Sequence, residues 1–112
     1  TIQEIAADRA EVVSRARDGK LQRFDLADGT FTISNLGMFG IEQFSAVLNP
    51  PQAAILAVGS TEEKPVVRDG QIEVRPLMSI TLTCDHRAID GADGAEFLRT
   101  VKELLEEPAL AL

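Results

Sequence analysis

The chain has 112 residues, 45% of them hydrophobic, and a net charge of -7 from 11 lysines and arginines against 18 aspartates and glutamates. This length is enough for one domain with a hydrophobic core, and the negative charge together with the absence of Trp and Tyr argues against nucleic acid as a partner. Because no apolar stretch is long enough to span a bilayer, we expect a soluble domain without a membrane partner.

The N-terminal segment has the pattern of an amphipathic helix. Thr1 and Glu4 have the spacing of a capping box, and Gly19 marks the end of the helix. The opposite, polar face is best explained as a solvated surface with paired charges, so we assign it no chemistry. The apolar residues at helical spacing, expected to face inward, are Ile2, Ile5, Ala6, Val13 and Ala16.

Three stretches in the middle of the chain suggest extended structure. Residues 30–34 alternate between polar and apolar and lead into a segment with two glycines, which indicates a sharp bend or a close approach of the backbone. Residues 44–48 are apolar and end at Asn49-Pro50-Pro51, where the prolines force a turn. Residues 53–58 then have the pattern of a fully buried strand.

A hairpin and another strand follow. Asp69-Gly70 is the strongest hairpin signal in the chain, and the apolar and β-branched residues of 66–68 and 72–75 flank it. Residues 77–83 continue with alternating apolar and hydroxyl side chains and lead directly to His86.

The last segment predicts a second amphipathic helix, with Asp90 or Asp93 as its cap and Pro108 as its stop. Its core residues would be Phe97, Leu98, Val101, Leu104 and Leu105. The order is therefore a helix, five or six strands and a helix, without the alternation of a parallel doubly wound fold. We predict an α+β fold in which a mixed, mostly antiparallel sheet is covered by two helices on one face. Two helices would leave apolar surface exposed in a monomer, so we expect oligomerisation or a missing second half.

His86, the only histidine, lies where the last strand gives way to Asp and Gly. At such a corner a rigidly held ring can face a cleft, as a general base must, although a single histidine is more often structural. A metal site is disfavoured because the nearby candidates, Cys84, Asp85 and Asp90, lack a second histidine and the usual ligand spacing. We therefore predict no metal.

Ser34 and Asp90 are the other candidate site residues. A hydrolase triad with Ser34 as nucleophile is disfavoured, because the glycine that a nucleophile elbow requires two residues earlier is absent. Ser34 is better interpreted as a hydroxyl donor. Asp90, four residues after His86, either orients the loop or ring or caps the following helix, and the two roles are compatible.

Cys84, Asp85 and Arg87 are expected to be structural. Asp85 and Arg87 are interpreted as a structural ion pair rather than as reactive groups. Cys84 is best interpreted as a small buried strand residue, because nothing supplies the basic setting that a reactive thiolate needs. As the only cysteine it cannot form an internal disulfide, which suits a reducing compartment.

Residues 85–91, Asp-His-Arg-Ala-Ile-Asp-Gly, resemble the DHRxxDG motif of the dihydrolipoamide acyltransferases, the E2 components of 2-oxo acid dehydrogenase complexes. Residues 29–40 and 49–53 are similar to other segments of that family, in the same order. Chloramphenicol acetyltransferase shares the fold, and peptide-synthetase condensation domains have HHxxxDG instead, so Asp85 favours the E2 interpretation. The resemblance implies that residues 1–112 are a C-terminal portion of the catalytic domain, about half of the CoA-dependent acyltransferase fold.

The resemblance implies an acyltransferase that moves an acyl group, by preference acetyl, between dihydrolipoamide and coenzyme A in a 2-oxo acid dehydrogenase complex. His86 would be the general base, Ser34 would donate to the oxyanion and Asp90 would support the histidine. Coenzyme A would be a substrate, the lipoyl group would belong to a separate domain, and no metal would be required. Succinyl and branched-chain acyl groups stay open.

The resemblance also implies trimers with a channel between adjacent subunits, so that Ser34 and His86 meet across chains. Trimers would build a cubic 24-mer or a dodecahedral 60-mer core through C-terminal contacts that Leu110 to Leu112 suit. The E1 and E3 components would bind through domains absent from this chain, in the cytoplasm or in a mitochondrial matrix. Two alternatives stay open: a non-catalytic core or assembly fragment of the same domain, and another CoA-dependent acyltransferase on this fold.

Overall fold

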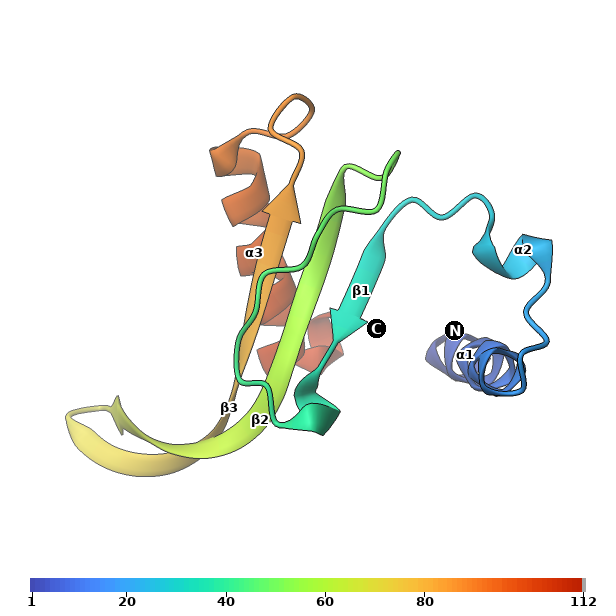
Figure 1. Ribbon diagram of the computed structural model, residues 1–112. Helices are drawn as coiled ribbons and strands as arrows, with labels where there is room; N and C mark the ends of the chain where they lie inside the picture. The colour runs from blue at the N-terminus through green and yellow to red at the C-terminus, as the bar shows by residue number, and fades with distance from the viewer. Residues whose placement is uncertain (112) are drawn as a thin grey trace.

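The computed structural model describes residues 1–111 and contains a three-stranded sheet with one 16-residue helix along it and a second helix of the same length to its side (Figure 1). Strand β1 (Thr32–Asn35) pairs in parallel with β2 (Ala54–Arg68), and β2 pairs antiparallel with β3 (Gln71–Cys84). The helical segments are α1 (Ile2–Arg17), α2 (Arg23–Leu26), η1 (Gly37–Phe39), α3 (Gly91–Glu106) and η2 (Pro108–Ala111). The predicted α+β class and the mixed, mostly antiparallel sheet are confirmed.

The sequence predicted five or six strands, but residues 1–111 contain three. The number is smaller because β2 and β3 are long and each includes two of the predicted strands. Residues 53–58 and 66–68 belong to β2, while 72–75 and 77–83 belong to β3. The predicted hairpin is confirmed, with Asp69 and Gly70 at φ values of 52° and 74°. Pro65 and Pro76 lie in the outer part of the hairpin, which is a curved ribbon of two strands (Figure 1). Each strand has an unpaired edge there, so the missing N–H of a proline is tolerated.

The apolar stretch 44–48 is not a strand but an irregular segment. It follows Ile41, whose carbonyl accepts a hydrogen bond from the N–H of Ser60 at 2.8 Å and so ties this part of the chain to β2. Alternate side chains of the stretch are half-buried, which explains why its sequence resembles a strand. The turn expected at Asn49-Pro50-Pro51 is present.

The core of the domain is the first half of β2, the central strand of the sheet. Residues 54–57 are the buried apolar residues, as the continuous apolar pattern predicts. Apolar side chains elsewhere remain exposed in the single chain, Ile33 on β1 at 65% and Ile72 on the hairpin at 79%. This confirms that the isolated chain leaves apolar surface uncovered.

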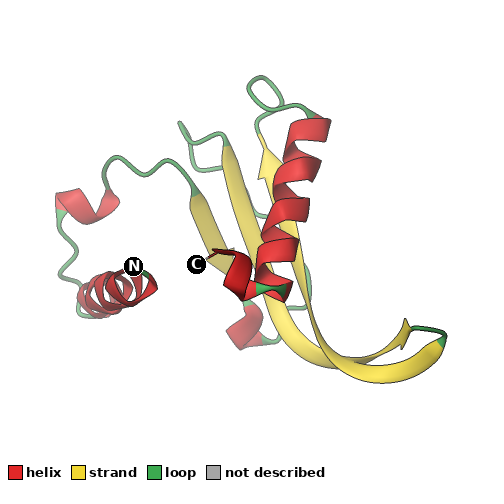
Figure 2. Ribbon diagram, turned by 180° about the vertical axis from the view of Figure 1, so that it is seen from behind, coloured by secondary structure: helices red, strands yellow, loops and turns green. Residues whose placement is uncertain are grey.

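Helix α1 forms where the sequence predicts it but does not cover the sheet. Its capping box is present, with the Glu4 N–H donating to the Thr1 hydroxyl at 3.2 Å. Figures 1 and 2 show α1 beside the sheet, beyond β1, and Ile2 and Ile5 are 66% and 68% exposed. Amphipathicity indicates that one face of a helix prefers to be buried, but it does not say against which surface.

Helix α3 is the helix that packs along the sheet, on the side of β3 (Figure 2). The ring of Phe97 lies 5.8 Å from that of Phe31, centroid to centroid, so the helix also reaches the start of β1. Leu110, to which the resemblance assigns contacts between trimers, is 69% exposed in this chain. Its side chain is therefore accessible to another subunit. Leu112, assigned to the same contacts, lies outside the described residues.

Gly59 lies at the irregularity in the β2–β3 pairing between Val58 and Thr61. A Cβ atom built there would be 1.9 Å from the backbone oxygen of Glu42. Because backbone must move to make room, we expect Gly59→Ala to lower the free energy of unfolding by about 1–3 kcal/mol. Gly91→Ala is the control, since a Cβ there meets nothing within 4 Å. Urea midpoints that fall equally in both variants would contradict this prediction.

Candidate functional site

His86 lies in a tight turn directly after β3. The N–H groups of Ala88 and Ile89 both donate to the carbonyl of Asp85 at 3.0 Å, so His86 is at the corner of the turn, as the sequence predicts. Its side chain is exposed and its imidazole makes no hydrogen bond to any of residues 1–111. The ring therefore faces solvent in the single chain, and only the backbone of the turn determines where it lies.

The Asp85–Arg87 ion pair expected from the sequence is confirmed. Two guanidinium nitrogens of Arg87 donate to the carboxylate of Asp85 at 2.7 to 3.2 Å, and the backbone N–H of Arg87 donates to Oδ1 at 3.0 Å. The guanidinium, followed by the backbone N–H, lowers the pKa of Asp85 from 3.8 to about 2. The carboxylate is thus charged throughout the neutral range.

The lowered pKa of Asp85 has a consequence at acid pH. Since the folded pKa lies below the ordinary value, the pair stabilises the folded state above pH 3.8, and this contribution is lost as the pH falls through about 2. We expect Arg87→Ala to return the pKa of Asp85 toward 3.8, as measured by an NMR titration of its carboxyl carbon. Arg75→Ala, which removes an Arg–Glu pair elsewhere on β3, should leave the titration unchanged. An Asp85 pKa that stays near 2 in Arg87→Ala would contradict the assignment of the pair.

Asp90 is the N-cap of α3, and its Oδ1 accepts a hydrogen bond from the Asp93 N–H at 2.9 Å. The capping role predicted for it is confirmed. Oδ2 makes no hydrogen bond within the described part of the chain, so one carboxylate oxygen remains for a second contact. Because α3 begins directly after Asp90, the cap fixes where the loop from His86 ends.

Ser34 lies on β1 and is not close to His86 in the single chain. In the sheet register Ser34 is opposite Ala57, which is opposite Thr81, three residues before Cys84. Cys84 is therefore about 10 Å along the strands and about 10 Å across the sheet from Ser34, and His86 follows two residues later. A hydrogen bond needs about 3 Å, so the structure does not bring the two candidate residues together in one chain.

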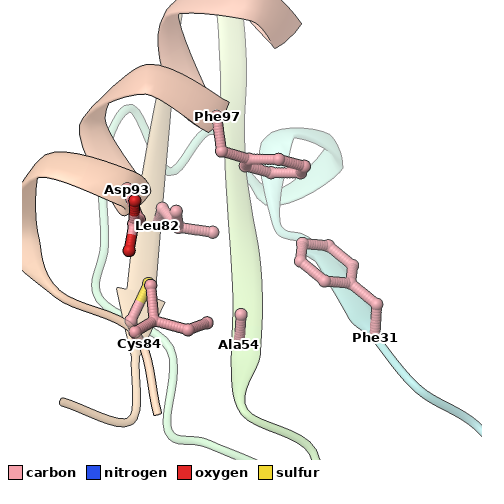
Figure 3. Close-up of a pocket in the computed structure, with 8 residues that line it drawn as sticks. Phe31, Ala54, Leu82, Cys84, Asp93 and Phe97 are labelled. Atoms are coloured by element: carbon pink, nitrogen blue, oxygen red, sulfur yellow. The ribbon is translucent and has the colours of Figure 1, made fainter.

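An apolar cavity of about 310 Å³ lies between the start of α3 and the sheet (Figure 3). Its walls come from β2, β3, α3 and Phe31, which directly precedes β1. Because no local pattern joins these segments, the cavity was not predictable from the sequence. Cys84 is half-buried in this wall, and a Cβ atom on Gly94 would lie 3.4 Å from its sulfur. The lining contains no basic residue and consists of Phe31, Ala54, Leu82, Cys84, Ile89, Asp93, Gly94 and Phe97.

Residues 1–111 contain no group of three or more His, Cys, Asp or Glu side chains arranged to hold a metal ion. Over the same residues no helix has both the length and the apolar character needed to cross a membrane.

Known proteins with similar sequences are acyltransferase components of 2-oxo acid dehydrogenase complexes. The family model of the 2-oxoacid dehydrogenases acyltransferase catalytic domain matches residues 1–112. The acetyltransferase component of the Rickettsia felis pyruvate dehydrogenase complex is 44% identical over 109 residues, which are 97% of this chain and 26% of that protein. The succinyltransferase component of the 2-oxoglutarate dehydrogenase complex from the same organism is 50% identical over 97 residues, 87% of this chain and 24% of that protein. The chain thus spans about a quarter of the length of these relatives.

Two solved structures match over the whole chain, each with 46% of its own chain covered. The dihydrolipoamide acetyltransferase of Azotobacter vinelandii gives a TM-score of 0.91 at 36% identity, and the cubic core of a pyruvate dehydrogenase multienzyme complex gives 0.92 at 35%. Work on the Azotobacter enzyme concerns a serine, a histidine and an asparagine in its catalytic mechanism, at positions 558, 610 and 614 of that enzyme.

Proposed function

Because this chain belongs to the family of 2-oxoacid dehydrogenase acyltransferase catalytic domains, we propose that it transfers an acyl group between dihydrolipoamide and coenzyme A. Residues 1–112 would form a C-terminal portion of that domain, with coenzyme A as a substrate and the lipoyl group arriving on a separate domain. The proposed site consists of His86, Ser34 and Asp90 and uses no metal.

The observation that carries the proposal is the spacing of the three site residues. In the Azotobacter enzyme the histidine follows the serine by 52 residues and the asparagine follows the histidine by four. In this chain His86 follows Ser34 by the same 52 residues and Asp90 follows His86 by four. The one departure is Asp90 in place of an asparagine, and its capping of α3 is a role that either side chain can fill.

The proposed reaction begins when the His86 imidazole takes the proton of the attacking thiol. The sulfur then attacks the carbonyl carbon of the acyl thioester, and the Ser34 hydroxyl donates a hydrogen bond to the oxyanion that forms. As the tetrahedral intermediate collapses, the second thiolate leaves and takes the proton back from the imidazolium of His86. The base and the donor are thus restored, and no proton is gained or lost overall.

The site is proposed to lie between two copies of the chain. In one chain Ser34 and His86 are too far apart to act on the same carbonyl group, so the residues must come from different subunits. The exposure of His86 and the uncovered apolar surface are consistent with this arrangement. Trimers that assemble into a larger core, as in the similar cubic core, are the proposed state, with E1 and E3 bound elsewhere on the complex.

Acetyl is the proposed acyl group, since seven of eight relatives of similar sequence are acetyltransferase components of pyruvate dehydrogenase complexes. Succinyl is the competing choice, because a succinyltransferase component matches at 50% identity. The proposed location is the cytoplasm of a bacterium or a mitochondrial matrix. A non-catalytic assembly role is the second candidate, favoured by the incomplete site of the single chain.

The test is transfer from acetyl-coenzyme A and from succinyl-coenzyme A to dihydrolipoamide. It is run on the chain itself and on a chimera in which residues 1–112 replace the matching segment of the Azotobacter enzyme. We expect the chimera to form the parent core and to prefer the acetyl donor. A chimera that assembles but transfers neither group would contradict the proposed function and favour the assembly role.

A further inference from the structure

The turn that holds His86 is organised around a single residue, Asp85. The backbone N–H of Asp85 donates to the carbonyl of Ala53 at 2.7 Å, which ties the turn to the start of β2. Its carbonyl oxygen accepts from the backbone of Ala88 and Ile89, so the chain is also fixed after His86. The side chain of Ile89 then lines the apolar cavity under α3.

The carboxylate of Asp85 closes the same turn from the other side. It accepts hydrogen bonds from both the backbone and the guanidinium of Arg87, the residue directly after His86. The Asp85 side chain is 24% exposed, whereas that of Arg87 is 91% exposed and still folds back onto it. An ion pair this exposed contributes little to stability, so its main effect is on the geometry of the turn.

His86 itself has no such attachment, since its imidazole lacks a hydrogen-bond partner among residues 1–111. Its position is therefore set by the backbone on either side, and both sides are held by Asp85. We propose that Asp85 and Arg87 are positioning residues, which together fix the backbone at His86 and so the point and the Cα–Cβ direction from which its imidazole projects. The kinetic consequence rests on the proposed function, but the effect on the ring does not.

The single histidine makes this inference testable without any assay of activity. In an untagged chain labelled with carbon-13 at the histidine ring, one signal reports on His86 alone. We expect Arg87→Ala to shift and broaden that signal, because the turn then samples several conformations. Asp85→Asn should act similarly, since it keeps an acceptor for the Arg87 N–H but loses the charge. Arg87→Lys should restore the wild-type signal only in part, because an ammonium lacks the two-pronged geometry.

Arg75→Ala is the matched control. It removes an arginine that pairs with a carboxylate two residues away, as Arg87 does, but this pair lies on β3, far along the hairpin from His86. The ring signal should not change in this variant. An Asp85→Asn/Arg87→Ala double variant should change the signal no more than Arg87→Ala does, since both substitutions break one pair.

The second readout is the kinetics of acyl transfer. They are measured on the chain itself if it is active, and otherwise on the chimera. We expect Arg87→Ala to lower kcat about tenfold to a hundredfold while the KM for both thiols stays the same, because the base is misplaced but binding is not. A higher KM for coenzyme A at unchanged kcat would overturn the inference and make Arg87 a binding residue. A ring signal identical to wild type in Arg87→Ala would also overturn it. If wild type transfers nothing, the proposed function fails, and the ring signal alone decides the positioning role.

Discussion

Replacing His86 with alanine should lower kcat for acyl transfer in the chimera by about a hundredfold to ten-thousandfold, the usual contribution of a general base. The KM for coenzyme A should change little, because the imidazole acts on the thiol proton in the transition state. His86 is exposed and makes no side-chain hydrogen bond within residues 1–111, so the substitution should not disturb the fold.

Two additional measurements separate lost chemistry from damaged structure. Lys102→Ala, on the exposed face of α3, is the control and should transfer at the wild-type rate. Imidazole added to His86→Ala should restore part of the rate, since a free base can enter the space left by the side chain. Transfer by His86→Ala at the wild-type rate would rule out His86 as the base.

Replacing Ser34 with alanine is the second large effect, with kcat expected to fall about a hundredfold to a thousandfold, as when one oxyanion donor is lost. The fall should appear in kcat rather than in KM, because the charge on the carbonyl oxygen develops only in the transition state. Ser34 is half-buried on β1 opposite Ala57, so removal of one oxygen leaves the strand pairing intact.

Ser60→Ala is a matched serine control for this effect. Its hydroxyl donates to the exposed Glu62 at 2.9 Å, away from the start of α3, and its loss should not alter transfer. Ser34→Thr retains a hydroxyl and should keep more activity than Ser34→Ala. Equal rates for Ser34→Ala and Ser60→Ala would remove Ser34 from the proposed site.

Local signals in the sequence predicted the parts of the fold that depend on local chemistry. The capping box at Thr1, the hairpin at Asp69-Gly70 and the cap at Asp90 are all present, because each needs only a few neighbouring residues. The ion pair between Asp85 and Arg87 belongs to the same class, with partners two residues apart.

Features that depend on distant parts of the chain were not predictable in the same way. Gly59 interrupts the β2 pattern because Glu42 approaches it closely, and nothing near Gly59 in the sequence announces that contact. The anchoring of Asp85 to Ala53 and the cavity under α3 arise from the pairing of strands far apart in sequence. The position of α1 beyond β1, where its apolar face stays exposed, is likewise not indicated by any local pattern.

The same distinction between local and long-range features applies to the candidate site. His86 and Ser34 were candidates from their local sequence, and the resemblance to a family supplied their roles. The turn geometry agrees with the role proposed for the histidine. Sequence alone could not give the separation of Ser34 from His86, since it follows from the register of three strands. Because of that separation, the proposed site needs a second copy of the chain.

The most direct test of a site shared between two subunits is to mix His86→Ala chains with Ser34→Ala chains, dissociate them and let them reassemble. Each variant alone should transfer almost nothing. In mixed trimers a Ser34 from one chain can face a His86 from its neighbour, so random assembly of equal amounts should restore about a quarter of the wild-type rate. A reassembled mixture no more active than the two variants measured separately would contradict a site built from two chains.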